Sequence, residues 1–156
     1  MEPMSDGSTR WRVWFGRVVL GGATLLMVRI GLEYLGNPVG AVTPRGITLG
    51  SAEGITMMRA VGGTFLAMAI AFGVSLVSDR RLVSGLGLLA IVAWTLTTTR
   101  LIGVALDGPA PFTLLVLKPE VALVVLSTAA FVLLRRRLPG RNPRSPTAEQ
   151  LATVSR

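Results

Sequence analysis

The sequence predicts an all-α fold, an integral membrane bundle of four antiparallel helices with both termini in the cytoplasm. Three observations support this fold class: 51% of the 156 residues are hydrophobic, four apolar segments have about 20 residues each, and most basic residues flank one side of these segments. A helix that rises about 1.5 Å per residue needs about 20 residues to cross about 30 Å of hydrocarbon. Because hydrocarbon offers no water to unpaired backbone groups, and the segments lack period-2 alternation, they are expected to cross as helices rather than strands.

The chain divides into one membrane domain and two tails. Residues 1–12 are expected to form a polar N-terminal tail and residues 138–156 a disordered cytoplasmic tail, because both hold few groups that could be buried. The four-helix transmembrane domain occupies residues 13–137. The helices are expected at about 13–35, 56–77, 82–106 and 112–134.

The first helix follows basic residues and precedes a small-residue pattern, so it could also be a cleaved secretory signal. Its length and its embedded Arg29 and Glu33 favour a membrane-spanning helix instead. The segment that follows, residues 36–55, is the longest loop and is rich in Pro and Gly. It is expected to face the exterior as a lid.

The sequence before the second helix predicts a helix start near Ser51 to Gly54, with Glu53 in the first turn, where a carboxylate complements the helix dipole. Along this helix Gly63, Ala67 and Ala71 form a stripe of small residues that lets another helix approach closely. The partner helix could belong to the same chain, or to an oligomer or another protein.

The third helix is joined to its neighbours by short connections. The connection at residues 78–81 is so short that the second and third helices must be antiparallel neighbours. Residues 107–111, between the third and fourth helices, form a rigid turn that contains Gly and Pro. In the fourth helix, Glu120 lies at heptad spacing from two hydroxyl residues and aligns with them if the helix is continuous. Pro119 either kinks this helix or begins it.

The charges predict the orientation. Eleven of the sixteen basic residues, but only four of the eight acidic ones, lie in the tails, at the adjoining helix ends and in the 78–81 connection. This side should therefore face the cytoplasm. The basic excess is expected to contact anionic lipid head groups rather than nucleic acid. Fifteen Arg against a single Lys are typical of GC-rich bacterial genes. Together with the four apolar segments, this ratio predicts a multi-pass protein of the bacterial cytoplasmic membrane.

The residue types restrict the chemistry. The sequence has no Cys and no His, which excludes thiolate nucleophiles, imidazole bases and the commonest zinc and haem ligands. We therefore expect no catalytic residues, no metal site and no cofactor. The expected partners are membrane lipids and a homo-oligomer or a larger membrane complex.

Six charged residues are embedded in the helices near the side expected to be exterior. An ionised side chain at the bilayer centre costs about 2.5–3.5 kcal/mol on insertion scales, so these groups should pair or reach water. We expect a network that joins the three Arg to the three acids. It could fix helix order, bind an anionic or small polar ligand, or be replaced by separate side chains that snorkel to water. The residues are Arg29, Glu33, Arg59, Arg100, Asp107 and Glu120.

The motif Met58-Arg59-Ala60-Val61-Gly62-Gly63, with Arg100, Asp107-Gly108 and Glu120, resembles a bacterial family of small four-helix membrane proteins, domain of unknown function 4345. The resemblance covers about residues 15–135. It implies four helices and an important outer charged cluster, and it implies no established activity.

Two functional hypotheses follow from these features. The first is a non-enzymatic accessory, scaffold or partner-binding bundle with a charged cluster near its extracytoplasmic side. The alternative is binding or transport of a small anionic or amphipathic ligand by Arg29, Arg59 and Arg100 under the 36–55 loop. A membrane enzyme is a third interpretation, in which Glu33, Asp107 and Glu120 supply the acid and base groups.

Overall fold

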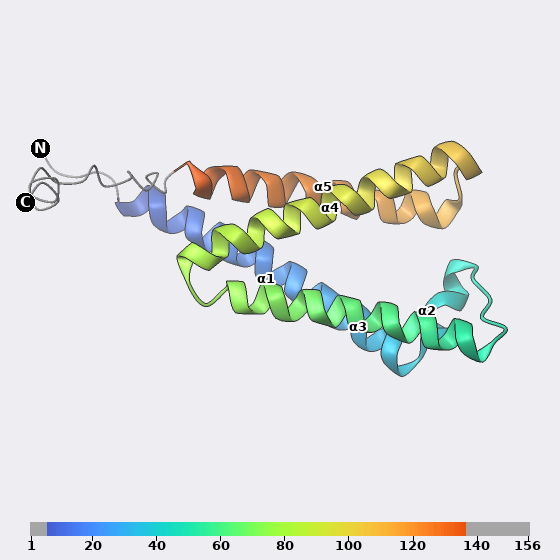
Figure 1. Ribbon diagram of the computed structural model, residues 1–156. Helices are drawn as coiled ribbons and strands as arrows, with labels where there is room; N and C mark the ends of the chain where they lie inside the picture. The colour runs from blue at the N-terminus through green and yellow to red at the C-terminus, as the bar shows by residue number, and fades with distance from the viewer. Residues whose placement is uncertain (1–5, 137–156) are drawn as a thin grey trace, which may run out of the picture.

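The structure, a computed structural model, describes residues 6–136, which form helices joined by short connections (Figure 1). Four of the helices are long and apolar enough to cross a membrane, which confirms the all-α membrane bundle. The elements are α1 Asp6–Gly36, α2 Pro38–Val42, the 3-10 helix η1 Thr43–Arg45, α3 Ala52–Ser75, α4 Asp79–Asp107 and α5 Pro111–Arg135.

The helix ends differ from the predicted ones in part. Helix α1 begins at Asp6, so residues 6–12 of the expected polar tail are helical; the rest of that tail and residues 138–156 lie outside the described residues. Helix α3 begins as predicted, because the Ser51 hydroxyl accepts a hydrogen bond from the Gly54 amide at 3.1 Å. Ser78 caps α4 in the same way, which places the following Asp-Arg-Arg inside the helix.

The segment expected to be an irregular lid contains α2 and η1. The Asn37 side chain accepts a hydrogen bond from the Gly40 amide at 2.9 Å and caps α2. Gly46 ends η1 with a φ of 78°, a left-handed conformation that favours glycine. Val42 is buried, so the lid has a small apolar anchor of its own.

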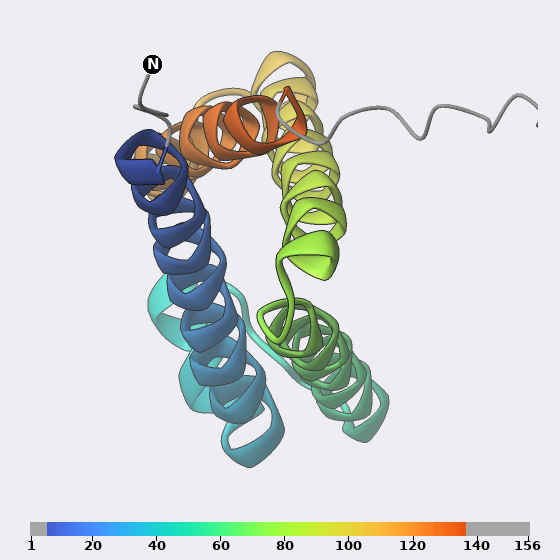
Figure 2. The same cartoon turned by 90° about the vertical axis from the view of Figure 1, so that its left-hand side faces the viewer.

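Two antiparallel helix pairs make up the bundle: α1 packs on α3, and α4 packs on α5 (Figure 1). We call the end with the start of α1 and the end of α5 the terminal end, and the end with the lid and the α4–α5 turn the loop end. At the terminal end, α5 lies between α1 and α4 (Figure 2). The pairs diverge toward the loop end (Figure 1).

The hydrophobic core lies where the two pairs meet. It is built from the middle of α1 and the terminal halves of α3, α4 and α5, so the packing that unites the pairs is concentrated away from the loop end. Its buried residues are Leu20, Ala23, Met27, Ala69, Phe72, Leu82, Leu86, Leu89, Ala130 and Leu134.

Helices α1 and α3 approach closely at Gly31 and Gly62. A Cβ atom added to Gly62 would lie 2.9 Å from the Gly31 carbonyl oxygen and 3.0 Å from the Leu35 amide nitrogen. Only glycine therefore fits at these two positions, because a Cβ atom at either one would collide with the backbone of the neighbouring helix.

The stripe of Gly63, Ala67 and Ala71 does not make this contact. All three residues are exposed, and among the described residues a Cβ atom on Gly63 would have no neighbour within 4 Å. Of the two alternatives for this stripe, packing within the chain is not observed among the described residues, because the inward face of α3 runs through Gly62, Ala69 and Phe72. Contact of the stripe with another molecule stays a prediction.

Candidate functional site

The loop end of the α4–α5 pair holds a partly buried ion pair. The Nε of Arg100 donates a hydrogen bond of 2.7 Å to Oε1 of Glu120, which ties α4 to α5. The Arg100 side chain is 34% exposed and that of Glu120 is 17% exposed. Among the described residues, this is the only ion pair between two members of the predicted six-residue network.

The groups around this pair have unused hydrogen-bonding capacity. Within residues 6–136, neither Nη atom of Arg100 has a hydrogen-bond acceptor. The Oε2 atom of Glu120 and the Oγ1 atom of Thr97, one turn before Arg100, are buried without a partner in the same part of the chain. The site therefore has donors and acceptors that its own side chains do not satisfy.

The position of Arg100 along α4 suits a group near the membrane surface. Helix α4 has 29 residues, and at about 1.5 Å per residue it is about 43 Å long, which exceeds the hydrocarbon thickness of about 30 Å. Arg100 precedes the last residue, Asp107, by seven positions, or about 10 Å. Its long side chain can reach the head-group level from there.

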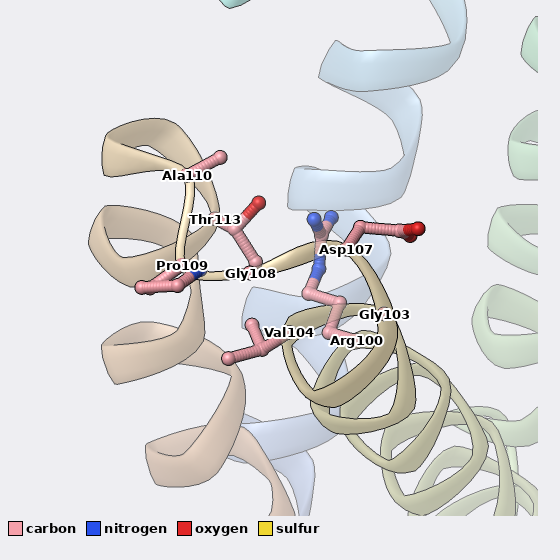
Figure 3. A pocket seen from close by; sticks show the side chains of 8 residues that line it. All are labelled: Arg100, Gly103, Val104, Asp107, Gly108, Pro109, Ala110 and Thr113. Atoms are coloured by element: carbon pink, nitrogen blue, oxygen red, sulfur yellow. The ribbon is translucent and has the colours of Figure 1, made fainter.

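A pocket of about 450 Å³ lies beside Arg100 at the α4–α5 turn (Figure 3). Gly108, with a φ of 88°, ends α4 in a conformation that favours glycine, and α5 then begins at Pro111 without a side-chain cap. In Figure 3 the carboxylate of Asp107 points away from the Arg100 guanidinium. The pocket is lined by Arg100, Gly103, Val104, Asp107, Gly108, Pro109, Ala110 and Thr113.

Helix α5 runs without a break from Pro111 to Arg135 and contains Pro119. Continuity of the helix was the condition for the predicted heptad alignment of Glu120 with two hydroxyl residues. Thr113 lines the pocket, Glu120 forms the ion pair, and Ser127 is buried and donates to the Val124 carbonyl at 3.2 Å.

The family to which this chain belongs can be identified from its sequence. Residues 15–131 match the family described as "Domain of unknown function (DUF4345)". The chain belongs to this family. No curated protein and no solved structure matches the chain. The resemblance inferred from the sequence is thus confirmed, and the match runs from α1 into α5 across the ion pair and the pocket of this DUF4345 protein.

The lid of the DUF4345 protein is held by a cation that the sequence analysis missed. Arg45 Nη1 donates to the Tyr34 hydroxyl at 2.5 Å, and its Nη2 lies 3.9 Å from Oε1 of Glu33. The guanidinium also lies 5.8 Å from the ring centroid of Phe112 on α5. Arg45 therefore connects the lid to both helix pairs at the loop end. It is the only charged residue between Gly36 and Ser51, which is the signal that could have identified it.

The other members of the predicted network are not joined as expected. Arg29 and Arg59 are exposed, and no ion pair links either to another described residue. Glu33 faces Arg45 instead of Arg29, although four residues separate Arg29 and Glu33 on α1. Asp107 is exposed and shares the pocket with Arg100 without pairing to it.

Two further polar contacts escaped prediction. At the terminal end, Arg17 pairs with Asp79 at 3.0 Å and joins α1 to the start of α4. Within the α4–α5 pair, Trp94 Nε1 donates to Thr128 Oγ1 at 3.2 Å. Across residues 6–136, no group of three or more acidic residues has the arrangement of a metal site.

Proposed function

We propose that this DUF4345 protein is a non-enzymatic accessory bundle of the bacterial cytoplasmic membrane, and that it binds a partner at its loop end through the Arg100–Glu120 pair. One observation carries the proposal. Arg100 is one-third exposed at a membrane-spanning helix, and both of its Nη atoms lack an acceptor within the described residues. A binding partner that offers an acceptor would satisfy these groups.

Membrane energetics support this interpretation. Charged side chains inside membrane helices are costly, and they usually pair inside a bundle or mark a functional contact. Here the pairing is incomplete, because Glu120 engages only the Nε of Arg100. Polar groups of a partner helix can form hydrogen bonds with such side chains, at about 0.6 kcal/mol on average in a membrane protein. Several such bonds together could give a specific contact.

The arrangement of the acids supports a binding role over catalysis. Glu120 is held by Arg100, Glu33 lies near Arg45, and Asp107 is exposed at the end of α4. Among the described residues, none of the three forms a hydrogen bond to a hydroxyl nucleophile, as general-base activation of Ser or Thr would need.

The exposed face of α3 supports a place for a partner helix. Gly63, Ala67 and Ala71 lie on this face, and small residues let a second helix come close enough for extensive backbone contact. The same face would serve a second copy of this chain or a different membrane protein.

The orientation belongs to the proposal as well. The excess of basic residues at the terminal end supports a cytoplasmic location for both termini and an exterior location for the loop end. Because the chain has no Cys, single-Cys variants report the topology directly. A membrane-impermeant maleimide added to intact cells should label Ala110→Cys and leave Val77→Cys unlabelled. The reverse labelling would overturn the orientation.

The test of partner binding compares Glu120→Gln with wild type after mild detergent extraction from the native membrane. Glu53→Gln is the matched control, because Glu53 is an exposed acid on α3, away from the ion pair. We expect a stoichiometric partner, a second copy or another protein, in wild type and Glu53→Gln and its loss in Glu120→Gln. Normal stability and an unchanged partner in Glu120→Gln would contradict the proposal.

A second candidate function is binding of a small amphipathic ligand, and the pocket at the α4–α5 turn favours it. Its volume of about 450 Å³ falls within the range of about 300–1,000 Å³ that small-molecule sites occupy. Among the three Arg proposed as ligand groups, Arg100 lines this pocket, and Arg29 and Arg59 do not. The candidate ligand site therefore lies at the α4–α5 turn rather than under the 36–55 loop.

A further inference from the structure

We propose that the pocket at the α4–α5 turn binds the zwitterionic head group of an aminophospholipid, with the phosphate on Arg100 and the ammonium on Asp107. This inference deepens the second candidate function and rests on it. The proposal names one ligand chemistry, a phosphate ester that carries its own primary ammonium group.

The phosphate side of the pocket is supplied by a guanidinium that Glu120 holds in place. Glu120 occupies the Nε position, and the two Nη atoms have no acceptor in the described part of the chain. Arg presents its donors in a planar fork that matches two phosphate oxygens at once. Thr113 on α5 adds a hydroxyl donor to the same pocket (Figure 3).

The ammonium side is supplied by Asp107. Asp107 is one of the residues that line the pocket, and its carboxylate points away from the guanidinium, on the side of Arg100 opposite Thr113 (Figure 3). Among the described residues it forms no ion pair. Asp107 is exposed, so a cation from outside the chain can reach it.

The local charge discriminates between ligand classes. Glu120 already offsets the charge of Arg100, so the ionised groups Arg100, Glu120 and Asp107 together carry −1. A purely anionic head group would add to this negative charge. Its binding would be opposed, because like charges at close range repel. A zwitterion adds no net charge and places its ammonium group beside the unpaired carboxylate.

The surroundings favour a lipid over a soluble phosphate ester. Arg100 lies about 10 Å before the end of α4, at the depth that suits a head group. The helix surfaces beside the pocket expose Leu101, Leu106 and Leu114, which are 50%, 79% and 45% exposed. Acyl chains attached to a bound head group can lie along these apolar side chains.

The test measures lipid binding by native mass spectrometry of the detergent-solubilised full chain, titrated with phosphatidylethanolamine or phosphatidylglycerol. Asp107→Asn is the informative variant, because within residues 6–136 Asp107 makes no ion pair that its loss would break. Glu53→Gln is the control for loss of one exposed acid near the loop end. Wild type and Glu53→Gln should bind phosphatidylethanolamine about two- to fivefold more tightly than phosphatidylglycerol, and Asp107→Asn should lose this preference.

The remaining outcomes separate the alternatives. Equal or tighter binding of phosphatidylglycerol by wild type, or a preference that survives Asp107→Asn, would overturn the inference. Glycerophosphoethanolamine, a soluble head group with the same phosphate diester and ammonium, should bind more weakly than the lipid; equal binding would reject the lipid as the source. If lipid preference fails while Glu120→Gln still releases a protein partner, this inference fails and the accessory function stands.

Discussion

A methyl group on Gly62 should destabilise the α1–α3 pair, whereas the same change on the next residue should not. In Gly62→Ala, the new Cβ atom would lie 2.9 Å from the Gly31 carbonyl oxygen and 3.0 Å from both the Leu35 amide nitrogen and Tyr34 Cβ. Ordinary contacts of a Cβ atom begin at 3.4 Å and extend to 4 Å, so the helices must separate locally by about 0.5–1 Å. Two of these neighbours are backbone atoms, which cannot rotate away.

The magnitude follows from two opposing terms. Overpacking of a close contact costs about 1–3 kcal/mol. Replacing Gly by Ala in a helix contributes about 0.5–1 kcal/mol of stability, because Gly loses more conformational freedom on folding. Gly63→Ala has only the second term, since a Cβ atom there has no neighbour within 4 Å. The helix-propensity terms cancel between the two variants, so Gly62→Ala should unfold with a free energy about 1–3 kcal/mol below that of Gly63→Ala.

The assay is reversible unfolding in mixed micelles by titration with sodium dodecyl sulfate, followed by helical circular dichroism. A difference between the two variants below about 0.5 kcal/mol would refute the close-contact interpretation, because exposed substitutions commonly vary by that amount. Hydrogen exchange adds a local readout. The contact involves Tyr34, which binds Arg45 of the lid, so Gly62→Ala should also increase amide exchange in α2 and η1.

Three further predictions concern other parts of the molecule. Phe72→Ala should lower the free energy of unfolding by about 3–5 kcal/mol because its side chain is fully buried, and Ile70→Ala, at a position that is 69% exposed, is the control in the same micelle titration. A double-mutant cycle on Arg100 and Glu120, measured the same way, should give a coupling of about 0.6–1.7 kcal/mol, the range for hydrogen bonds between membrane helices, and a value near zero would show that the hydrogen bond contributes no stability. Arg45→Ala should raise amide exchange in α2 and η1 about tenfold, because the variant loses one hydrogen bond, two aromatic contacts and the ion pair with Glu33; unchanged exchange would mean that other groups hold the lid.

The sequence predicted the four helices because their signal is strong and local. Each segment is long, apolar and bounded by turn residues, and these properties require no knowledge of neighbours. The Ser51 cap was predictable for the same reason, since the hydroxyl and the amide it accepts from are three residues apart. The first helix was placed too late because polar residues outside the hydrocarbon can continue a helix, and hydropathy does not report them.

The candidate site was predictable only in part. Arg100 and Glu120 were selected as embedded charges, and their contact needed only the antiparallel order of α4 and α5. The remaining pairings depend on how the helices rotate and tilt, which membrane helices set through neighbours rather than through amphipathicity. Gly62 and Gly63 show the difficulty, because adjacent small residues fit the same motif and only helix rotation decides which one is buried.

The concentration of the shared core away from the loop end also bears on how the protein is assembled. Helices α1 and α3 are consecutive membrane helices joined by the lid, and α4 and α5 are consecutive membrane helices joined by a short turn, so each pair can insert as a hairpin. Each pair thus forms a contiguous module, and a three-residue tether, Leu76-Val77-Ser78, separates the module of residues 6–75 from that of residues 79–136. Two fragments divided at this tether, when coexpressed, would retain every helix and every core residue. If the two polypeptides reassemble, the α4–α5 pair of one molecule could be replaced by the α4–α5 pair of another.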